Sequence, residues 1–162
     1  MPVLIPFGVD QDPHFRITRD VAPKINKPKP ALIHNIMIPA LGGPKGKMSA
    51  SNENETIYTT DSPEVVRNKI NKYAFSGGQP DIEEHRKKGG NPDIDVSFQY
   101  LRIFFEPDDK KLQQIHDDYK SGKMLTGELK EILIEKINKF LAIHQQKRED
   151  ARSQLDEFLF KD

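Results

Sequence analysis

The sequence predicts a parallel α/β unit at the start of the chain and an all-helical domain after it. Residues 1–60 alternate short apolar runs with stretches rich in Pro, Gly and Asn, which is typical of strands and loops. From residue 61 onward the apolar residues recur at helical spacing instead. A chain of 162 residues is long enough for one good core or two modest halves, so it can hold both parts.

The α/β prediction rests on a strand, a helix and a second strand in that order. Residues 3–7 and 31–38 are short runs of the strand type. Between them, Asp12 followed by Pro13 is typical of a helix N-cap with proline at the first helical position, and the helix is expected to end near Pro23. Two strands joined through a helix in this way are parallel.

Ligands of such folds bind beyond the carboxyl ends of the strands. Two loops are expected at that edge of the sheet. Residues 8–11 follow the first predicted strand, and residues 42–51 follow the second. We therefore expect these two loops to converge on one crevice.

The helical domain is predicted from capping residues and apolar stripes. Asp61 and Glu64 have the spacing of a capping box around Pro63, and Thr126 is placed to cap the longest helix. The apolar stripe of that longest helix is Leu129, Leu133, Ile137 and Leu141. These signals predict that the second part of the chain is built from amphipathic helices.

Shorter helices are predicted between these two. They span residues 82–88, residues 93–105 and a segment from about residue 112 to residue 121. The aromatic pairs expected in the core are Phe98 with Tyr100 and Phe104 with Phe105. Their helical spacing favours a packing role over a role in stacking on a ligand.

Composition excludes several classes of protein. The chain has no cysteine, which rules out disulfides and thiolate metal sites, and no apolar segment approaches the length of a membrane span. The first residues lack the basic start and apolar run of a signal peptide. We therefore expect a cytoplasmic protein.

Hydropathy and charge set further limits. Hydrophobic residues make up 35% of the chain and the mean hydropathy is -0.71, both low for a self-contained globular protein. Either many helices are solvated or part of the core lies on chain beyond this sequence.

The charges are distributed unevenly along the chain. Residues 1–51 carry seven Lys and Arg against three acids, whereas the remainder carries 18 Lys and Arg against 22 acids. Any contact of the second half with nucleic acid is therefore expected to be local.

A glycine-rich stretch at residues 42–46 precedes Lys47, Ser49 and Ser51. Glycines let the backbone bend close to a ligand, lysine is a compact cation, and serines supply small hydroxyls, so together they can grip a polyphosphate. A Walker P-loop is excluded, because the glycine spacing is too short and Met48 stands where Ser or Thr would bind magnesium. By composition alone, a flexible solvated loop explains the stretch equally well.

Asp10 and Gln11 follow Gly8 at the end of the first predicted strand. A carboxylate at this place can accept hydrogen bonds from ribose hydroxyls, and an amide can hold a zwitterionic ligand without adding charge. Helix capping by Asp10 or Asp12 is the simpler alternative. The five histidines show no metal-ligand spacing, so structural or surface roles are expected for them.

Several segments together resemble one family of enzymes. Lys47-Met48-Ser49-Ala50-Ser51 is similar to the KMSKS signature of class I aminoacyl-tRNA synthetases. Residues 8–16 (GVDQDPHFR) and 18–23 (TRDVAP) narrow the resemblance to the tryptophanyl enzymes of the eukaryotic and archaeal cytosolic type. The tyrosyl enzymes share the Asp-Gln and KMSKS elements but not these surroundings. The segments that agree in the second half are residues 74–78, 83–86, 89–91, 93–98 and 121–130.

The resemblance implies a fold, a reaction and partners. Residues 1–60 would be the C-terminal part of a Rossmann catalytic domain, and residues 61–162 a helical anticodon-binding domain. Enzymes of this family activate L-tryptophan with ATP and Mg²⁺, release pyrophosphate and transfer the aminoacyl group to tRNA(Trp). A homodimer is expected for the full-length enzyme, and no metal site made of protein side chains is expected.

The resemblance also implies roles for individual residues. The expected catalytic residues, which would stabilise negative charge on the leaving pyrophosphate, are Lys47, Ser49 and Ser51. The expected ATP-binding residues are Gly8, Asp10, Lys47, Met48, Ser49, Ala50 and Ser51, with Asp10 on the ribose. The residues expected to line the tryptophan pocket are Gln11, which would hold the polar end, and Phe15, which would pack on the indole. The residues expected to contact the tRNA anticodon are Phe75, Gln79, Asp81 and Arg86.

Three departures from the family pattern limit these expectations. The commoner motif has a second lysine where this chain has Ala50, and Lys45 either substitutes for it or has no catalytic role. Residues 79–81 (Gln-Pro-Asp) stand where a basic and acidic pair is expected. The family's other nucleotide signature, His-x-Gly-His or a relative of it, is expected well upstream of these segments and does not occur in the chain. We therefore expect a C-terminal portion of the enzyme that is inactive alone. A non-catalytic anticodon-binding module is the alternative.

Overall fold

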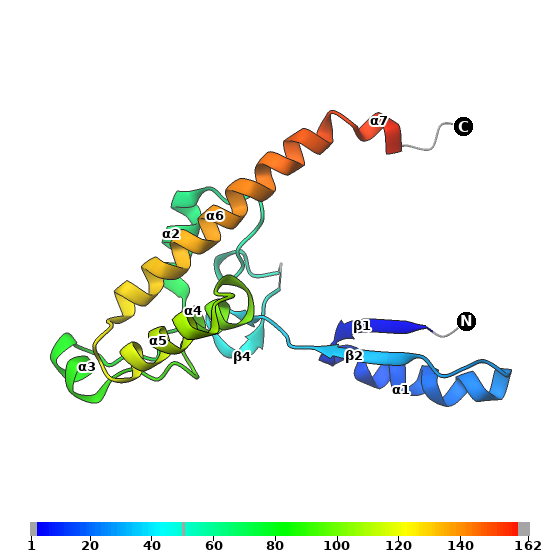
Figure 1. The fold of residues 1–162 in the computed structure, drawn as a ribbon, viewed down its shortest axis with the longest axis horizontal. Helices are drawn as coiled ribbons and strands as arrows, with labels where there is room; N and C mark the ends of the chain where they lie inside the picture. The colour runs from blue at the N-terminus through cyan, green and yellow to red at the C-terminus, as the bar shows by residue number, and fades with distance from the viewer. Residues whose placement is uncertain (1–2, 50, 159–162) are drawn as a thin grey trace. The chain divides into compact units, whose positions relative to one another are not determined.

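The computed structural model describes residues 3–49 and 51–158. Contacts between residues divide the chain into two compact units, Met1–Ile38 and Pro39–Asp162 (Figure 1). By contacts, residues 39–60 belong to the same unit as the helices. The predicted boundary at residue 60 separates a catalytic part from an anticodon-binding part, so it concerns function and stays a prediction.

The first unit is the predicted strand, helix and strand. Its elements are β1 (Leu4–Gly8), the 3-10 turn η1 (Val9–Gln11), α1 (Asp12–Val21), the 3-10 turn η2 (Ala22–Ile25) and β2 (Ala31–Asn35). Strands β1 and β2 pair in parallel, with Leu4 beside Ala31 and Gly8 beside Asn35. The parallel pairing confirms the α/β prediction.

Asp12 is not the N-cap of α1, which corrects the prediction made from Asp12-Pro13. The turn η1 runs directly into the helix, so Gln11 precedes it and Asp12 is its first residue. The Asp12 carboxylate instead accepts hydrogen bonds from Arg16 Nε at 2.5 Å and from His34 Nε2 at 2.8 Å. Because His34 lies on β2, Asp12 ties the helix to the second strand.

Apolar side chains remain exposed on the first unit. Those with large exposed areas include Leu4, Ile17, Ile25, Ile33 and Ile36. Parallel strands are normally covered on both faces, and a two-stranded sheet is at best marginally stable alone. This unit therefore presents more apolar surface than its own helix covers.

The second unit begins with a hairpin and continues as helices. Its elements are β3 (Pro39–Ala40), β4 (Gly43–Lys47), the 3-10 turn η3 (Glu53–Glu55), α2 (Pro63–Tyr73), α3 (Ile82–Lys88), α4 (Val96–Tyr100), the π-helical turn η4 (Leu101–Phe105), α5 (Asp109–Lys120), α6 (Thr126–Arg152) and α7 (Leu155–Phe158). Strands β3 and β4 are antiparallel. The stretch expected as a loop from residue 42 therefore starts as a strand, and the helix expected over residues 93–105 is divided into α4 and η4.

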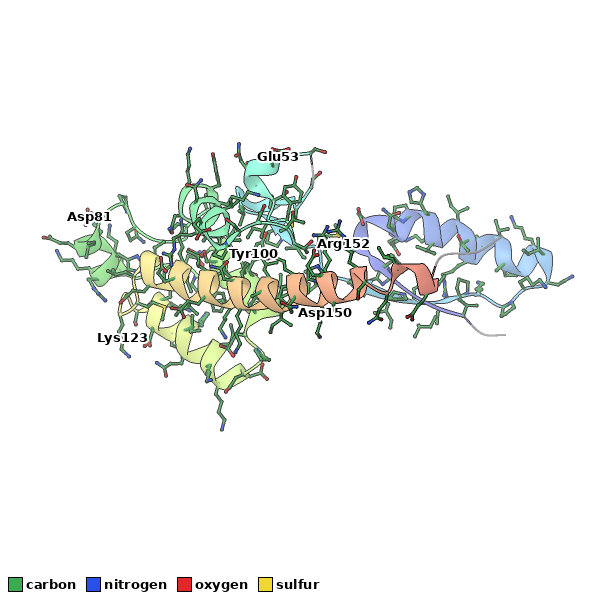
Figure 2. The ribbon with its side chains drawn as sticks, turned by 90° about the horizontal axis from the view of Figure 1, so that it is seen from above. Glu53, Asp81, Tyr100, Lys123, Asp150 and Arg152 are labelled. Atoms are coloured by element: carbon green, nitrogen blue, oxygen red, sulfur yellow. The ribbon has the colours of Figure 1, made fainter. Side chains whose placement is uncertain are left out.

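Helix α6 is the main packing element of the second unit. Its predicted stripe is confirmed, because Leu129, Leu133, Ile137 and Leu141 are all buried. Figure 2 shows Asp81 and Lys123 at the end of the unit where α6 begins, and Asp150 and Arg152 at the other end of the helix. None of the helices in residues 3–49 and 51–158 has the length and apolar composition that a membrane crossing needs.

The aromatic pairs of α4 and η4 differ in burial. Phe98 and Tyr100 are buried as predicted, and the Tyr100 hydroxyl donates to the Pro39 carbonyl at 2.7 Å. Phe104 is 60% exposed, so its predicted place in the core is wrong. Phe104 lies within the π-helical turn, where the side-chain spacing differs from that of the α-helix assumed in the prediction.

Asp61 is not the cap of α2, because Ser62 takes that position. The Ser62 hydroxyl accepts from the Val65 N–H at 3.3 Å. Asp61 Oδ2 instead accepts from Lys69 Nζ at 2.7 Å, and both side chains are only 11% exposed. Lys69 Nζ also donates to the Thr56 carbonyl at 2.8 Å. A buried cation on α2 therefore anchors the preceding segment.

Thr126 is not the cap of α6 either. Leu125 precedes the helix, and its N–H donates to Glu128 Oε2 at 2.7 Å. The Thr126 hydroxyl instead lies 3.1 Å from the Tyr119 hydroxyl and 3.2 Å from the Ser76 hydroxyl. The side chain is used to join the start of α6 to two other segments.

We expect Lys69→Met to lower the free energy of unfolding by about 3 kcal/mol, because it leaves Asp61 and a backbone carbonyl buried without their cation. Arg67→Met on the same helix is the matched control. The Arg67–Glu131 pair is 52% and 43% exposed, so its loss should cost under about 1 kcal/mol. Urea denaturation of the two variants measures the difference, and equal losses would contradict the anchoring role of Lys69.

Candidate functional site

The end of β1 brings the predicted nucleotide residues Gly8 and Asp10 close together. A Cβ built on Gly8 would lie 2.9 Å from Asp10 Oδ1 and 3.0 Å from Met37 Sδ. The absence of a side chain at Gly8 therefore leaves room for the Asp10 carboxylate beside the strand end. Asp10 and Gln11 are exposed, as ligand-binding groups at the edge of a sheet need to be.

Phe15 is held on α1 by an aromatic contact. Its ring lies 4.5 Å from the ring of Phe7, which is buried at the end of β1. Phe7 also contacts His34 edge-on at 4.7 Å. Phe15 is half-buried, so part of its ring stays accessible for an aromatic ligand.

The Asp12–His34 contact was not found from the sequence, because its members are far apart along the chain. The hydrogen bond from His34, together with the contact to Arg16, holds the pKa of the Asp12 carboxyl below its usual value. Asp12 therefore stays ionised at neutral pH. It fixes the start of α1, and with it Gln11 and Phe15, against β2.

The signature segment, residues 47–51, follows the hairpin of the second unit. Lys47 is the last residue of β4 and its backbone lies opposite Pro39. Ala50 lies outside the described residues. The Ser49 hydroxyl donates to the Ser51 hydroxyl at 3.2 Å and accepts from the Ser51 N–H at 3.4 Å. The two exposed serines therefore place their hydroxyls side by side.

The two predicted ATP loops belong to different units. Gly8 and Asp10 lie in the first, and residues 47–51 lie in the second. Their convergence on one crevice stays a prediction. Among the residues that the structure describes, no three His, Cys, Asp or Glu side chains are grouped to hold a metal ion.

The predicted anticodon residues lie between α2 and α3 and on α3, but most of their polar groups have structural partners. Phe75 is 43% exposed. The Gln79 amide donates to a backbone carbonyl at 3.0 Å, and Asp81 Oδ1 caps α3 at 2.8 Å. The Arg86 guanidinium donates to two carbonyls in the loop before α6. Phe75 is thus the member whose ring is most plainly available to a ligand.

A groove of about 520 Å³ lies beside these residues. The residues that shape it include Gln79, Asp81, Ile82, Gly127, Glu128 and Glu131. Ile82 is 64% exposed and supplies an apolar surface next to carboxylates. The carboxylates of α6 were missed by sequence reasoning, because nothing local relates residues 127–131 to residues 79–82.

Buried polar groups hold this region together. Asp95 is fully buried and accepts from Gly77 N–H at 2.8 Å, from the Tyr119 hydroxyl at 2.8 Å, and from Ser97 N–H at 2.9 Å. Burial and the Asp95 charge raise the pKa of Tyr119 to about 12. Tyr119 therefore stays neutral and donates to Asp95, while its oxygen accepts from the Thr126 hydroxyl at the start of α6.

His85 fixes α3 against the loop before α6. Its Nδ1 accepts from the Gln79 N–H at 3.4 Å, and its Nε2 lies 2.9 Å from the Met124 carbonyl. A backbone N–H can only donate and a carbonyl can only accept, so these partners fit a neutral imidazole with its proton on Nε2. The structural role predicted for the histidines is confirmed at His85, which is buried.

We expect Tyr119→Phe to lower the free energy of unfolding by about 1–2 kcal/mol, because Asp95 then loses one buried donor. Tyr73→Phe on α2 is the control and should change it by less than about 0.5 kcal/mol. Thermal or urea unfolding measures both. An unchanged stability in Tyr119→Phe would mean that the Asp95 hydrogen bonds do not hold the region together.

Comparisons with known proteins agree on one family. The model of the tRNA synthetases class I (W and Y) matches residues 2–142. The chain is 59% identical over 157 residues to the tryptophan–tRNA ligase of Sulfurisphaera tokodaii, covering 97% of this chain and 41% of that protein. It is 55% identical over 152 residues to the cytoplasmic tryptophan–tRNA ligase of Homo sapiens, covering 94% and 32%.

Solved structures give the same result. The chain is similar to the tryptophanyl-tRNA synthetase of Aeropyrum pernix K1, with a TM-score of 0.88 and 38% identity over 94% of this chain and 42% of that one. The tryptophanyl-tRNA synthetase of Giardia lamblia matches with a TM-score of 0.84 and 46% identity, covering 90% and 36%. The chain thus spans less than half the length of these relatives.

Proposed function

This chain belongs to the class I tRNA synthetases for tryptophan and tyrosine, and we propose that it is the C-terminal portion of a tryptophan–tRNA ligase. The observation that carries the proposal is its 59% identity to a tryptophan–tRNA ligase over nearly its whole length. The reaction would be the ATP-dependent activation of L-tryptophan and its transfer to tRNA(Trp).

The first unit would contribute to binding the nucleotide and the amino acid. The exposed Asp10 carboxylate beside Gly8 suits the hydroxyls of a ribose, and the exposed Gln11 suits the polar end of tryptophan. The accessible part of the Phe15 ring suits the indole. The carboxylate of tryptophan would attack the α-phosphorus of ATP, and pyrophosphate would leave. In such a reaction the protein acts mainly by positioning and by charge stabilisation.

The segment 47–51 would act on the phosphates. Lys47 would stabilise negative charge on the leaving pyrophosphate, and the adjacent hydroxyls of Ser49 and Ser51 would donate to its oxygens. Met48 and Ala50 would complete the loop around the nucleotide. Mg²⁺ would be carried by the ATP phosphates.

The second unit would bind the anticodon. The tryptophan codon UGG pairs with the anticodon CCA, and each base of CCA carries an amino group. Carboxylates accept from such amino groups, so the groove with Asp81, Glu128 and Glu131 suits these bases. The exposed Phe75 offers a ring on which an unstacked base can stack.

Three further properties follow from the same proposal. The functional domains would be residues 1–60 and 61–162, a catalytic part and an anticodon-binding part. The full-length enzyme would be a homodimer. It would work in the cytoplasm, as the name of the human relative states for that protein.

For the chain of residues 1–162 alone, we expect no tryptophan-dependent exchange of pyrophosphate into ATP, because the His-x-Gly-His signature is absent from it. In a longer protein that contains this chain and that signature, exchange should occur, and Lys47→Ala should slow it roughly 10²-fold or more. Robust exchange by residues 1–162 alone would refute the fragment proposal. Unchanged exchange in Lys47→Ala would refute the role of Lys47.

We expect the chain to bind tRNA(Trp) more tightly than the same tRNA with an altered anticodon. Phe75→Ala should weaken binding about tenfold, because a stacked base is worth about 1–3 kcal/mol. Phe104→Ala is the control, since that ring is also exposed but belongs to η4. Filter binding measures both. Equal binding of the two tRNAs would argue against anticodon reading by this chain. If binding depends on the anticodon but Lys47→Ala leaves pyrophosphate exchange unchanged in the longer protein, a non-catalytic module would be favoured.

A further inference from the structure

Thr56 links the signature segment, residues 47–51, to helix α2 of the same unit. Its hydroxyl donates to the Ser49 carbonyl at 2.6 Å, and the residue is only 6% exposed. The Asn52 N–H donates to the same carbonyl at 3.2 Å. Ser49 is therefore held through its main chain by a residue that lies beyond the segment.

The other end of Thr56 is anchored as well. Its carbonyl accepts from Lys69 Nζ at 2.8 Å, and that ammonium also donates to Asp61 and lies 4.7 Å from the centre of the Tyr58 ring. The Tyr58 N–H donates to Asp61 Oδ2 at 3.0 Å, which fixes the carboxylate. Thr56 thus stands between the signature segment and a buried cation of α2.

The segment is held on its N-terminal side by separate bonds. The hairpin turn is fixed at Leu41, whose N–H donates to the Glu55 carbonyl at 3.2 Å and whose carbonyl accepts from the Phe75 N–H at 2.7 Å. Leu41 is fully buried. Residues 47–51 therefore lie between two anchors, one at Leu41 and one at Thr56.

The Thr56 bond engages the Ser49 backbone and leaves the Ser49 hydroxyl for other partners. A group that stabilises a developing charge must be held to within about 0.5 Å of its productive position. A segment preceded by glycines does not achieve this from its own sequence, because glycine backbones are the most flexible. An external anchor on the main chain supplies the restraint without using a phosphate donor.

We propose that Thr56 is a positioning residue, whose buried hydroxyl holds the main chain of Ser49 in the place from which the signature segment receives the ATP phosphates. The proposal rests on the ATP-binding role proposed above for this segment. Lys69 on α2 donates to the Thr56 carbonyl, and the Thr56 hydroxyl donates to the Ser49 carbonyl. These two hydrogen bonds connect α2 to Ser49.

The test compares Thr56→Val, which keeps the shape but removes the donor, with Thr56→Ser, which keeps the donor. Amide hydrogen exchange of the full chain is followed by mass spectrometry in peptides from residues 48–55, with peptides from α1 and α6 as internal controls. Thr56→Val should speed exchange in residues 48–55 about tenfold, the factor that one net hydrogen bond supplies. Thr56→Ser should stay within about twofold of the original chain.

Two results would overturn the proposal. One is unchanged exchange at residues 48–55 in Thr56→Val. The other is an equal acceleration of amide exchange in peptides from α6, because the Thr56 hydroxyl would then stabilise the whole unit and not residues 48–55 in particular. A Thr56→Ser variant that exchanges as fast as Thr56→Val would count against it in the same way.

Magnesium-ATP separates this proposal from the proposed function. In a longer protein that contains this chain and the His-x-Gly-His signature, saturating magnesium-ATP should slow exchange at residues 48–55 with the original Thr56 and with Thr56→Ser, and Thr56→Val should need about tenfold more nucleotide for the same protection. If none of the three is protected, the ATP role of the segment fails while the restraint by Thr56 is still judged by the exchange rates. If all three are protected at the same concentration, the positioning role fails while the ATP role stands.

Discussion

The second unit depends on one buried carboxylate. Asp95 accepts from the Gly77 N–H, from the Tyr119 hydroxyl and from two backbone N–H groups at the start of α4. A buried charge without such partners would cost several kcal/mol, so every segment that supplies a donor is held in place by that requirement. Position 77 has no room for a side chain, because a Cβ there would lie 2.0 Å from the Asn91 carbonyl oxygen. The groove beside α3 and α6 is therefore built on a rigid base.

The same unit connects the two kinds of contact that the proposed function needs. The Phe75 N–H bonds to Leu41, Leu41 bonds to Glu55, and the neighbouring Thr56 holds Ser49. The residue proposed to stack on a tRNA base and the segment proposed to meet the ATP phosphates are thus parts of one hydrogen-bonded strip. Because these hydrogen bonds connect Phe75 to the signature segment, the position of one constrains the position of the other.

Much of this fold could be predicted from the sequence. The strand, helix and strand of the first unit follow from apolar runs on either side of Asp12-Pro13, and the parallel pairing confirms them. The stripe of α6 follows from simple periodicity and is buried as predicted. The predicted family is also confirmed, because the model of the class I tRNA synthetases (W and Y) matches residues 2–142. It could be predicted because the signature segment and its neighbours are runs of consecutive residues. Features of this kind are local, and local features are what a sequence shows directly.

What could not be predicted is the partner of each polar side chain. Asp12, Asp61 and Thr126 each stand where a helix cap is favourable, yet each bonds to a side chain outside the first helical turn. The partners are His34, Lys69 and Tyr119 respectively. A cap and a tertiary contact make the same demand on a side chain, namely a short polar group close to the backbone. The sequence therefore indicates that a hydrogen bond will form at such a position, whereas the choice of partner depends on which part of the fold packs against it. That choice also decides the candidate site, because the carboxylates of α6 and the hydroxyl of Thr56 gain their proposed roles only from segments that the fold brings to them.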